Sequence, residues 1–142
     1  LAMRLQKRKS RVFVLTGDGE INEGSNWEAA MAAAKHKLSN LTVLVDYNKL
    51  QSYGRTADVL DLEPLSDKFK SFGFITHEVD GHDISALEKI FKKLPFSKDA
   101  PSAIICHTVK GKGFPFAEGN PEWHHKSGLT EDDFRKMYEC LQ

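Results

Sequence analysis

Two mostly apolar, β-branched runs lie in the first third of the sequence, separated by a segment of helical periodicity. The runs are "RVFVLT" at residues 11–16 and "LTVLVDY" at residues 41–47. Runs of this length without polar alternation are typical of strands covered on both faces. Between them, apolar residues recur every three or four positions, as they do along one face of a helix. The sequence therefore predicts a βαβ unit with two parallel strands.

The helix inside this unit has a recognisable start and a recognisable face. Ser25 and Glu28 match a capping box, in which the side chain of each residue accepts a hydrogen bond from the backbone N–H of the other. The apolar positions at helical spacing are Trp27, Ala30, Met31, Ala34 and Leu38. We expect this face to pack against the sheet.

The rest of the chain continues the alternation of strands and helices. We expect a strand in "FGFITHEVD", a helix running from Ile84 to Leu94, a strand in "PSAIICHTV", a long glycine-rich loop and a last helix opened by Thr130. This order favours the α/β class, a parallel sheet with helices on both faces. We interpret residues 1–142 as a single domain. Its first residues resemble the end of a helix without an N-cap, so we expect a domain that lacks its amino-terminal portion.

Composition narrows the possible functions. Twenty basic and twenty acidic residues give a formal net charge of +0, so the excess positive charge of a nucleic-acid-binding protein is missing. No apolar run approaches the length of a membrane span, and no signal-peptide pattern is present. Cys106 and Cys140 lack metal-ligand spacing and are expected to be reduced. We therefore expect a cytoplasmic protein with no nucleic-acid partner and no membrane partner.

Glycine and polar residues gather where the first two strands end. "GDGE" follows the first strand and "NKLQ" follows the second. Open α/β sheets bind ligands at the carboxyl ends of neighbouring strands. Asp18 supplies a carboxylate oxygen, Asn48 an amide oxygen, and Gly17 and Gly19 leave the backbone open to close approach. This set suits Mg²⁺ bound with a diphosphate, although "DG" and "NK" are also common turn pairs.

These motifs resemble those of a known family. "GDG", followed by residues 20–47 and then Asn48, resembles the thiamine diphosphate motif, which usually ends in two asparagines; here Tyr47 replaces the first of them. The stretches "GDGEINEGSNWEAAMAAAKHKLSNLTVLVDYNKLQSYG", "VDGHD", "HTVKGKG" and "PEWHHK" follow the transketolase order, and from the first to the last they span nearly the whole chain. The chain thus resembles the amino-terminal, thiamine diphosphate-binding section or subunit of transketolases. The family's upstream segment, which carries cofactor-contacting histidines and a glycine-rich turn, has no counterpart here.

The resemblance implies a metal and cofactor site. Asp18, the Asn48 side chain and the Leu50 backbone carbonyl would bind Mg²⁺, or Ca²⁺ or Mn²⁺ in its place. The cofactor-binding residues that the resemblance implies are Gly17, Asp18, Gly19, Glu20, Ile21, Asn48, Leu50 and His124. Backbone amides at Gly19 and Glu20 would meet the diphosphate. Ile21 and Leu50 are apolar enough to line the thiazolium ring, although ordinary packing also explains them.

Three further residues need interpretation, and two of them, His124 and Glu23, have two interpretations each. His124 in "PEWHHK" aligns with a family histidine near the diphosphate and the reacting carbon, so it is the catalytic candidate; the alternative is a loop histidine facing water. Glu23 is similar to a family glutamate at the subunit interface, or it is a first-turn acid facing the helix dipole. His82 in "DGHD" is expected to be a turn residue, with Asp83 as the cap of the next helix.

The resemblance implies an activity as well. It is the thiamine diphosphate- and Mg²⁺-dependent transfer of a two-carbon ketol unit from a ketose phosphate to an aldose phosphate, as in the pentose phosphate pathway, with this chain supplying the diphosphate and metal half of the site. In the family, the glutamate that activates the cofactor lies on a pyrimidine-binding domain. We therefore expect a carboxy-terminal subunit or domain as partner, in a dimer or heterotetramer, and no activity from the chain alone.

Other functions remain open at this point. An oxo-acid dehydrogenase α chain or a deoxyxylulose-phosphate synthase shares the framework from Asp18 to Asn48. A nucleophile or a second carboxylate beside Asp18 would favour a Mg²⁺-dependent phosphate-transfer domain, and Asp46 is the only nearby candidate in the sequence. A non-catalytic α/β interaction module would need no site at all. Cofactor binding measured with and without Mg²⁺ separates these hypotheses.

Overall fold

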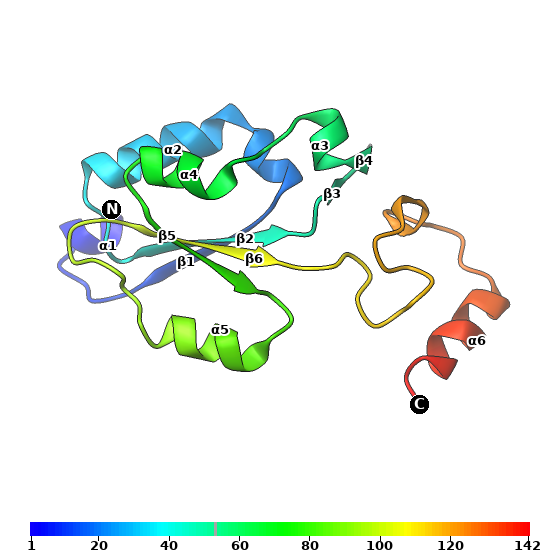
Figure 1. Cartoon of the computed structure of the whole chain (residues 1–142). Coiled ribbons are helices and arrows are strands. Elements are labelled where there is room, and N and C mark those ends of the chain that lie inside the picture. The colour runs from blue at the N-terminus through cyan, green and yellow to red at the C-terminus, as the bar shows by residue number, and fades with distance from the viewer. Residues whose placement is uncertain (53) are drawn as a thin grey trace.

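A four-stranded parallel sheet forms the centre of the molecule. The structure is a computed structural model and describes residues 1–52 and 54–142. The four strands are β1 (Val12–Gly17), β2 (Leu41–Tyr47), β5 (Ile75–Asp80) and β6 (Ser102–His107). They are ordered β1-β2-β6-β5, and all neighbours are parallel (Figure 1). A short antiparallel pair, β3 (Leu50–Gln51) and β4 (Gly54–Arg55), follows β2. The predicted parallel α/β fold is confirmed.

Helices lie on both faces of this sheet, as predicted. One face carries α2 (Gly24–Lys35) and α4 (Leu65–Ser71), and the other carries α5 (Ile84–Phe91) (Figure 1). The remaining helical segments are α1 (Ala2–Leu5), α3 (Thr56–Val59), α6 (Glu131–Glu139) and the 3₁₀ turns η1 (Gly19–Asn22) and η2 (Pro121–Trp123). Helices α3 and α4 and the β3-β4 pair were not predicted, because such short segments show too few repeats of any period. Among the described residues, no helix combines the length and apolar character that crossing a membrane requires.

Strand β6 lies at the centre of two apolar layers. Ile105 is 1% exposed and packs in the cluster under α2 and α4, whereas Ile104 is fully buried in the cluster under α5. Burial of a side chain of this size stabilises a fold by roughly 1.5–3 kcal/mol. The continuous apolar run in this part of the sequence reflects burial on both faces.

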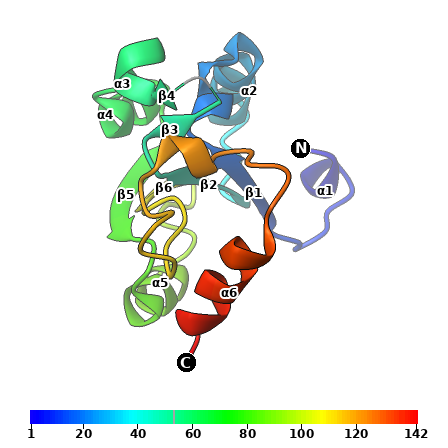
Figure 2. The ribbon, with the colours of Figure 1, turned by 90° about the vertical axis from the view of Figure 1, so that its right-hand side faces the viewer.

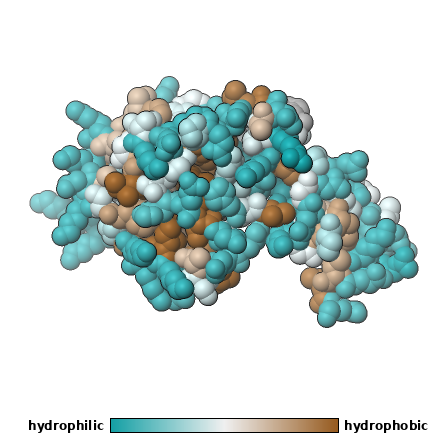
Figure 3. All heavy atoms as spheres, in the orientation of Figure 1, coloured by the Kyte–Doolittle hydropathy of each residue, from teal (hydrophilic) through white to brown (hydrophobic). Residues whose placement is uncertain are grey.

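Strand β1 is not buried on both faces, although its apolar run predicted that it would be. Its residues Val12 to Leu15 are exposed, and Leu15 reaches 71%. The reason is its place at the edge of the sheet, since its described ladder partner is β2 alone. On the α5 side, Phe13 meets Phe91 of α5 at a ring-centroid distance of 6.1 Å. Figure 3 shows hydrophobic residues at the surface where the sheet meets α5. The prediction that β1 is covered on both faces is therefore wrong.

The start of α2 also differs from the prediction. The N-cap is Glu23, without a side-chain cap, so the capping box expected from Ser25 and Glu28 does not form. Turn η1 runs directly into α2, and the side chains of Asn26 and Trp27 donate hydrogen bonds of 2.7 and 2.9 Å to carbonyl oxygens of η1. These side chains satisfy carbonyl groups of the turn, which ties η1 to the helix.

The buried face of α2 is narrower than predicted. Ala30 and Ala33 are the buried residues of this helix, and Met31 is 54% exposed. Small side chains at the contact let α2 lie close to the sheet. Trp27 extends this contact by packing on Phe69 and Phe72, with ring centroids 5.3 and 5.0 Å away.

The predicted caps of the last two helices are confirmed. The Asp83 side chain accepts a hydrogen bond of 2.9 Å from the Ala86 N–H and caps α5. Thr130 caps α6 in a capping box with Asp133. The apolar face of α6 is not buried, however, because Phe134, Tyr138 and Leu141 are 48%, 68% and 70% exposed. In Figure 1, α6 stands apart from the sheet and its helices.

Candidate functional site

The carboxyl ends of β1 and β2 bring the predicted metal ligands together. The two strands pair in parallel with Gly17 beside Asp46, so Asp18 and Asn48 follow at the same edge of the sheet. The Lys49 N–H donates a hydrogen bond of 2.5 Å to Asp18 Oδ2. Residues that are far apart in the sequence are therefore in direct contact, as the βαβ interpretation predicts.

Asp18 is a buried carboxylate with hydrogen bonds to both oxygens. It is 2% exposed; Oδ1 accepts from the Gly19 N–H at 2.7 Å, and Oδ2 accepts from Lys49. Burial raises the pKa of this carboxyl, while the two backbone N–H groups oppose that rise. The negative charge of Asp46 raises the pKa further, and the positive charge of Lys110 lowers it. A cation at this point would favour the ionised carboxylate.

Asn48 and Leu50 lie in one tight turn beside Asp18. Asn48 Oδ1 accepts a hydrogen bond of 3.0 Å from the Leu50 N–H, and Lys49 between them has a left-handed φ of 66°. The amide Nδ2 of Asn48 lies 3.4 Å from Asp46 Oδ1, to which it donates. Asp46 also accepts a hydrogen bond from Thr108. The Asp46 carboxylate therefore braces the strand ends, which disfavours its use as a second phosphate-transfer acid.

The Gly-Asp-Gly segment forms a close-fitting backbone wall. A Cβ at Gly19 would lie 2.9 Å from Gln51 Cβ, so this position accepts no side chain without a shift. Gly17 has open space where its Cβ would lie, and its N–H donates a hydrogen bond of 3.3 Å to Glu20 Oε2. The N–H groups of Gly17 and Gly19 already donate to carboxylates of this segment, so what glycine provides here is room for a ligand to approach the backbone closely.

These elements border a cavity of about 300 Å³. The residues that line it are Gly17, Asp18, Gly19, Glu20, Asp46, Asn48, Leu50, Gln51, Ser52, Lys110 and His124. Nowhere in residues 1–52 and 54–142 do three His, Cys, Asp or Glu side chains gather in a way that could hold a metal ion. The predicted ligands Asp18, Asn48 and Leu50 all border this cavity, and oxygen ligands of these kinds are accepted by hard cations such as Mg²⁺.

His124 reaches the same cavity from a distant part of the chain. It follows η2, and Figure 2 shows this loop in front of the strand ends. Its Nδ1 is buried and has no hydrogen-bond partner among the described residues. Burial lowers the pKa of His124, and the positive charges of Lys110 and His125 lower it further. A half-buried, neutral imidazole with a free nitrogen is suited to bind a ligand or to accept a proton.

Two orphaned polar atoms point to a ligand with several polar groups. Besides His124 Nδ1, the buried Nε2 of Gln51 lacks a partner within the described part of the chain, and both residues line this cavity. Buried polar groups are nearly always paired in native proteins, so exceptions at one cavity are informative. A diphosphate with its metal ion would offer oxygen acceptors to the Gln51 amide. The residues present therefore fit a thiamine diphosphate and metal site.

Ile21 and Glu23 lie outside this cavity. Ile21 is 2% exposed and belongs to the apolar core with Trp27, so packing accounts for its side chain. Glu23 is exposed at the N-cap of α2. His82 is tied into its turn, where its Nε2 accepts a hydrogen bond of 2.8 Å from the Val109 N–H. The interpretation of His82 as a turn residue agrees with this contact.

Three lining residues were not predicted from the sequence, namely Gln51, Ser52 and Lys110. Gln51 and Ser52 directly follow the predicted ligand Leu50, so the strand-end rule could have included them. Lys110 lies in "HTVKGKG" beyond the end of β6, the next strand of the sheet. Lys110 also lines an adjoining cavity of about 540 Å³, which shares Asn48 and Leu50 with the first. A cation between two cavities suits an anionic ligand that extends across both.

Comparison with known proteins places the chain among related sequences. Residues 5–141 match the family described as transketolase, thiamine diphosphate binding domain. One subunit of the apulose-4-phosphate transketolase of Actinobacillus succinogenes is 46% identical over 127 residues, which cover 89% of this chain and 45% of that protein. The 6-deoxy-6-sulfo-D-fructose transketolase subunit SqwG of a Clostridium species is 37% identical over 142 residues, 100% of this chain and 51% of that protein. The chain spans about half the length of the curated relatives it matches.

Solved structures agree with this assignment. The transketolase of Campylobacter jejuni superposes with a TM-score of 0.83 at 29% identity, covering 93% of this chain and 20% of that chain. A Pichia stipitis transketolase in complex with sedoheptulose-7-phosphate gives a TM-score of 0.82 at 27% identity, covering 94% and 20%. The fold of this chain is thus the fold of a section of those larger enzymes.

Proposed function

This chain belongs to the transketolase family, in its thiamine diphosphate binding domain, and from that premise we propose that it forms the diphosphate- and metal-binding half of a transketolase site. The reaction is the transfer of a two-carbon ketol unit from a ketose or ketose phosphate to an aldose or aldose phosphate. The observation that carries this proposal is the convergence of Asp18, Asn48 and Leu50 on one cavity that His124 also reaches.

The metal site uses three oxygen ligands from this chain. They are an Asp18 carboxylate oxygen, the Asn48 amide oxygen and the Leu50 backbone carbonyl, with Mg²⁺ as the expected ion and Ca²⁺ or Mn²⁺ as substitutes. Binding of the cation favours the ionised form of Asp18, which burial alone disfavours. The same cation neutralises part of the diphosphate charge. The cation would thus contact both the buried Asp18 carboxylate and the anionic diphosphate, which explains why an acid borders a cavity proposed to bind an anion.

The diphosphate is held by backbone and by one side-chain cation. The backbone of Gly17, Gly19 and Glu20 forms the wall that the diphosphate would approach, and Lys110 provides a positive charge that the described residues leave without an ion-pair partner. Ile21 supports this wall from the core side. When bound, thiamine diphosphate supplies the nucleophilic carbon that cleaves a ketose next to its carbonyl group.

His124 is the proposed catalytic residue of this chain. Its lowered pKa keeps the imidazole neutral near neutral pH, so Nδ1 can accept a proton or a hydrogen bond from a sugar hydroxyl. Its half-buried position limits the access of water to that nitrogen. The role of His124 is therefore to hold or move a proton at the substrate.

A partner completes the proposed site. The relatives described above are named as subunits of their transketolases, and this chain matches about half of each. We infer a pyrimidine-binding subunit or domain as partner, in a dimer or heterotetramer. The relatives carry the names of apulose-4-phosphate and 6-deoxy-6-sulfo-D-fructose, so the substrate of this chain is assigned only to the class of anionic ketoses and aldoses.

The test is cofactor binding by the chain assembled with its partner. Isothermal titration calorimetry with thiamine diphosphate should give binding in Mg²⁺ and none in a metal chelator. Two-carbon transfer is then assayed on a panel of sugar phosphates, with the chain alone and with the partner added. We expect transfer only from the assembly. Thiamine diphosphate binding that is unchanged by the chelator would contradict the metal site. Full transfer activity of the chain without its partner would contradict the half-site proposal.

A further inference from the structure

The segment that carries His124 is anchored at both ends by side-chain contacts. It begins at Trp123, whose ring packs on Phe116 with centroids 4.8 Å apart. It ends at Lys126, whose Nζ lies 3.7 Å from the centroid of the Trp123 ring. The contact between Trp123 and Lys126 therefore closes a short loop that contains His124 and His125. A cation over an indole is attracted by the negative face of the ring.

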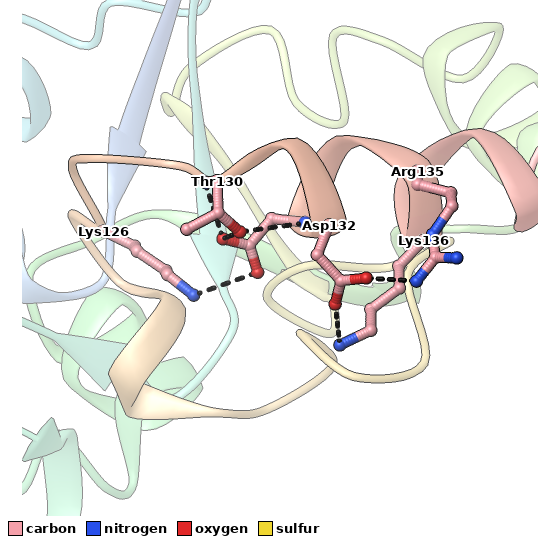
Figure 4. A network of polar contacts seen from close by, with 6 residues as sticks. Lys126, Thr130, Asp132, Arg135 and Lys136 are labelled. Carbon is pink, nitrogen blue, oxygen red and sulfur yellow. Dashed lines mark hydrogen bonds and ion pairs between the residues drawn. The ribbon is translucent and has the colours of Figure 1, made fainter.

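Lys126 also connects this loop to α6. Its Nζ lies 3.5 Å from Asp133 Oδ1, and the two side chains are 32% and 15% exposed (Figure 4). The pair of Lys136 and Asp132 on the same helix is more open, at 54% and 49%. Exposed ion pairs are weakened by solvent and salt, so the Lys126 pair is the better anchor of the two.

The Asp133 end of this contact is itself held in place. Asp133 Oδ2 accepts hydrogen bonds from the Thr130 N–H at 2.9 Å and from the Thr130 hydroxyl at 2.8 Å (Figure 4). The Asp133 N–H donates in return to Thr130 Oγ1 at 3.2 Å. With Oδ2 fixed by the capping box, Oδ1 is presented to Lys126 at little further cost in side-chain entropy.

The segment between the anchors adopts a conformation that needs support. His125 has a left-handed φ of 61°, which is unfavourable for a residue with a Cβ. Its ring lies 4.2 Å from the His124 ring, and its Nε2 lies 3.5 Å from Ser52 Oγ at the cavity. A loop of this kind returns to other conformations unless contacts outside it hold it in place.

We propose that Lys126 is a positioning residue that holds His124 at the cavity by clamping Trp123 to the first turn of α6. This inference rests on the proposed function of His124. Lys126 does not line the cavity. It acts by its contact with the Trp123 ring, which closes the loop of residues 123–126 and so fixes the place of His124. Loss of the clamp leaves the metal and diphosphate wall intact and lets His124 move away from the reacting carbon. Small displacements of a catalytic group lower turnover strongly.

The experiment compares three variants of the chain assembled with its partner. Lys126→Met removes the charge, Lys126→Arg keeps both a cation for the ring and a donor for Asp133, and Lys136→Met removes the more exposed pair on α6 as a matched control. Hydrogen exchange of residues 120–129 reports the loop directly, calorimetry reports thiamine diphosphate affinity in Mg²⁺, and kinetics report turnover. For Lys126→Met we expect exchange and turnover to change by about tenfold, with cofactor affinity within about twofold.

Lys126→Arg should restore both exchange and turnover, and Lys136→Met should match the unaltered protein. Unchanged exchange in Lys126→Met would overturn the clamp, and faster exchange with normal turnover would overturn the positioning role. Equal losses in Lys126→Met and Lys136→Met would do the same, because they would show a general charge effect. If the unaltered assembly binds no thiamine diphosphate in Mg²⁺, the proposed function fails, whereas the exchange comparison still decides whether Lys126 holds the segment.

Discussion

The two sides of the cavity are built in different ways. Asp18 and Asn48 sit at the ends of paired strands, and backbone N–H groups hold their side-chain oxygens. His124 sits in a loop, where an aromatic contact, a cation–π contact and one ion pair connect the loop to neighbouring elements. The first side directly follows two paired strands, and its carboxylate at Asp18 is only 2% exposed. The second depends on a few side chains at the surface.

This contrast separates binding from turnover. The strand-end side cannot move without disturbing the pairing of β1 with β2, so the cofactor and metal are expected to be held by the fold itself. The loop side can move at a small free-energy cost, because its contacts are few and partly exposed. Variants on the first side should therefore change affinity, and variants on the second should change turnover.

The largest effect is expected at Asp18. Asp18→Ala removes the buried carboxylate that would bind the metal, so Mg²⁺-dependent thiamine diphosphate affinity should fall by at least about 100-fold. Asn48→Ala should weaken binding in the same way by removing the amide oxygen. Calorimetry on the assembled protein measures both, and thermal unfolding checks that the fold survives. Asp67→Ala, at an exposed pair on α4, is the control that should bind normally. Normal affinity in either site variant would contradict the metal assignment.

The next effect is expected on the loop side. His124→Ala removes the proposed proton acceptor, and turnover should fall by about 100-fold while cofactor affinity stays within about twofold. Steady-state kinetics and calorimetry on the same preparation measure the two quantities. His36→Ala, an exposed histidine after α2, is the control. A turnover number equal to that of the unaltered protein would show that His124 is a loop histidine without a catalytic role.

A backbone variant in the preceding loop sharpens the same contrast. Gly111 has a φ of 78°, and a Cβ there would lie 2.5 Å from the Ala117 carbonyl oxygen. Gly113 has a φ of 100° with open space around its Cβ position. Gly111→Ala should therefore cost about 1–3 kcal/mol more than Gly113→Ala, because it adds a clash to the strain. Limited proteolysis of the loop and turnover measure the effect. Equal behaviour of the two variants would show that packing against Ala117 does not hold this loop.

A smaller effect is expected at the cap of α6. Thr130→Ala removes the hydroxyl of the capping box and should destabilise the helix by about 1 kcal/mol. Faster hydrogen exchange in α6 is the measurement, and Thr130→Ser, which keeps a hydroxyl, is the matched control. The strand-end side should not respond, so cofactor affinity should be unchanged. Slower exchange in Thr130→Ala would contradict the capping interpretation.

The smallest expected effect is a lowered titration midpoint of the His124 imidazole. Burial places the pKa of His124 below its ordinary value of 6.5, so the imidazole stays neutral as the pH falls through 6.5 and becomes charged only at lower pH. The stability that the buried neutral form contributes is present above pH 6.5 and is lost as the pH falls through the lowered pKa. Proton NMR of the His124 ring, assigned with His124→Gln, should give a midpoint below 6.5. A midpoint at or above that value would contradict the burial argument.

Much of the fold followed from local patterns. The strands around Val14, Val45 and Ile104 were predicted because mostly apolar, β-branched runs are typical of strands. The caps at Asp83 and Thr130 were predicted because a cap depends on residues within one turn. The false capping box at Ser25 shows the limit of such patterns, since η1 moved the start of α2. A local pattern indicates which conformations a segment can adopt, and contacts with neighbouring segments select one of them.

The alternation of strands and helices and the residue types at the two strand ends could be predicted from the sequence, because both depend on short-range periodicity and side-chain chemistry. The tertiary structure was needed to place β1 at an edge with Leu15 exposed, since an apolar run carries no information about its partner strands. It also decided that Lys110 and Gln51 border the cavity and that Lys126 reaches both Trp123 and Asp133. These contacts depend on the path of a loop. Where the sequence shows no periodicity, the elements on which the loop packs set that path.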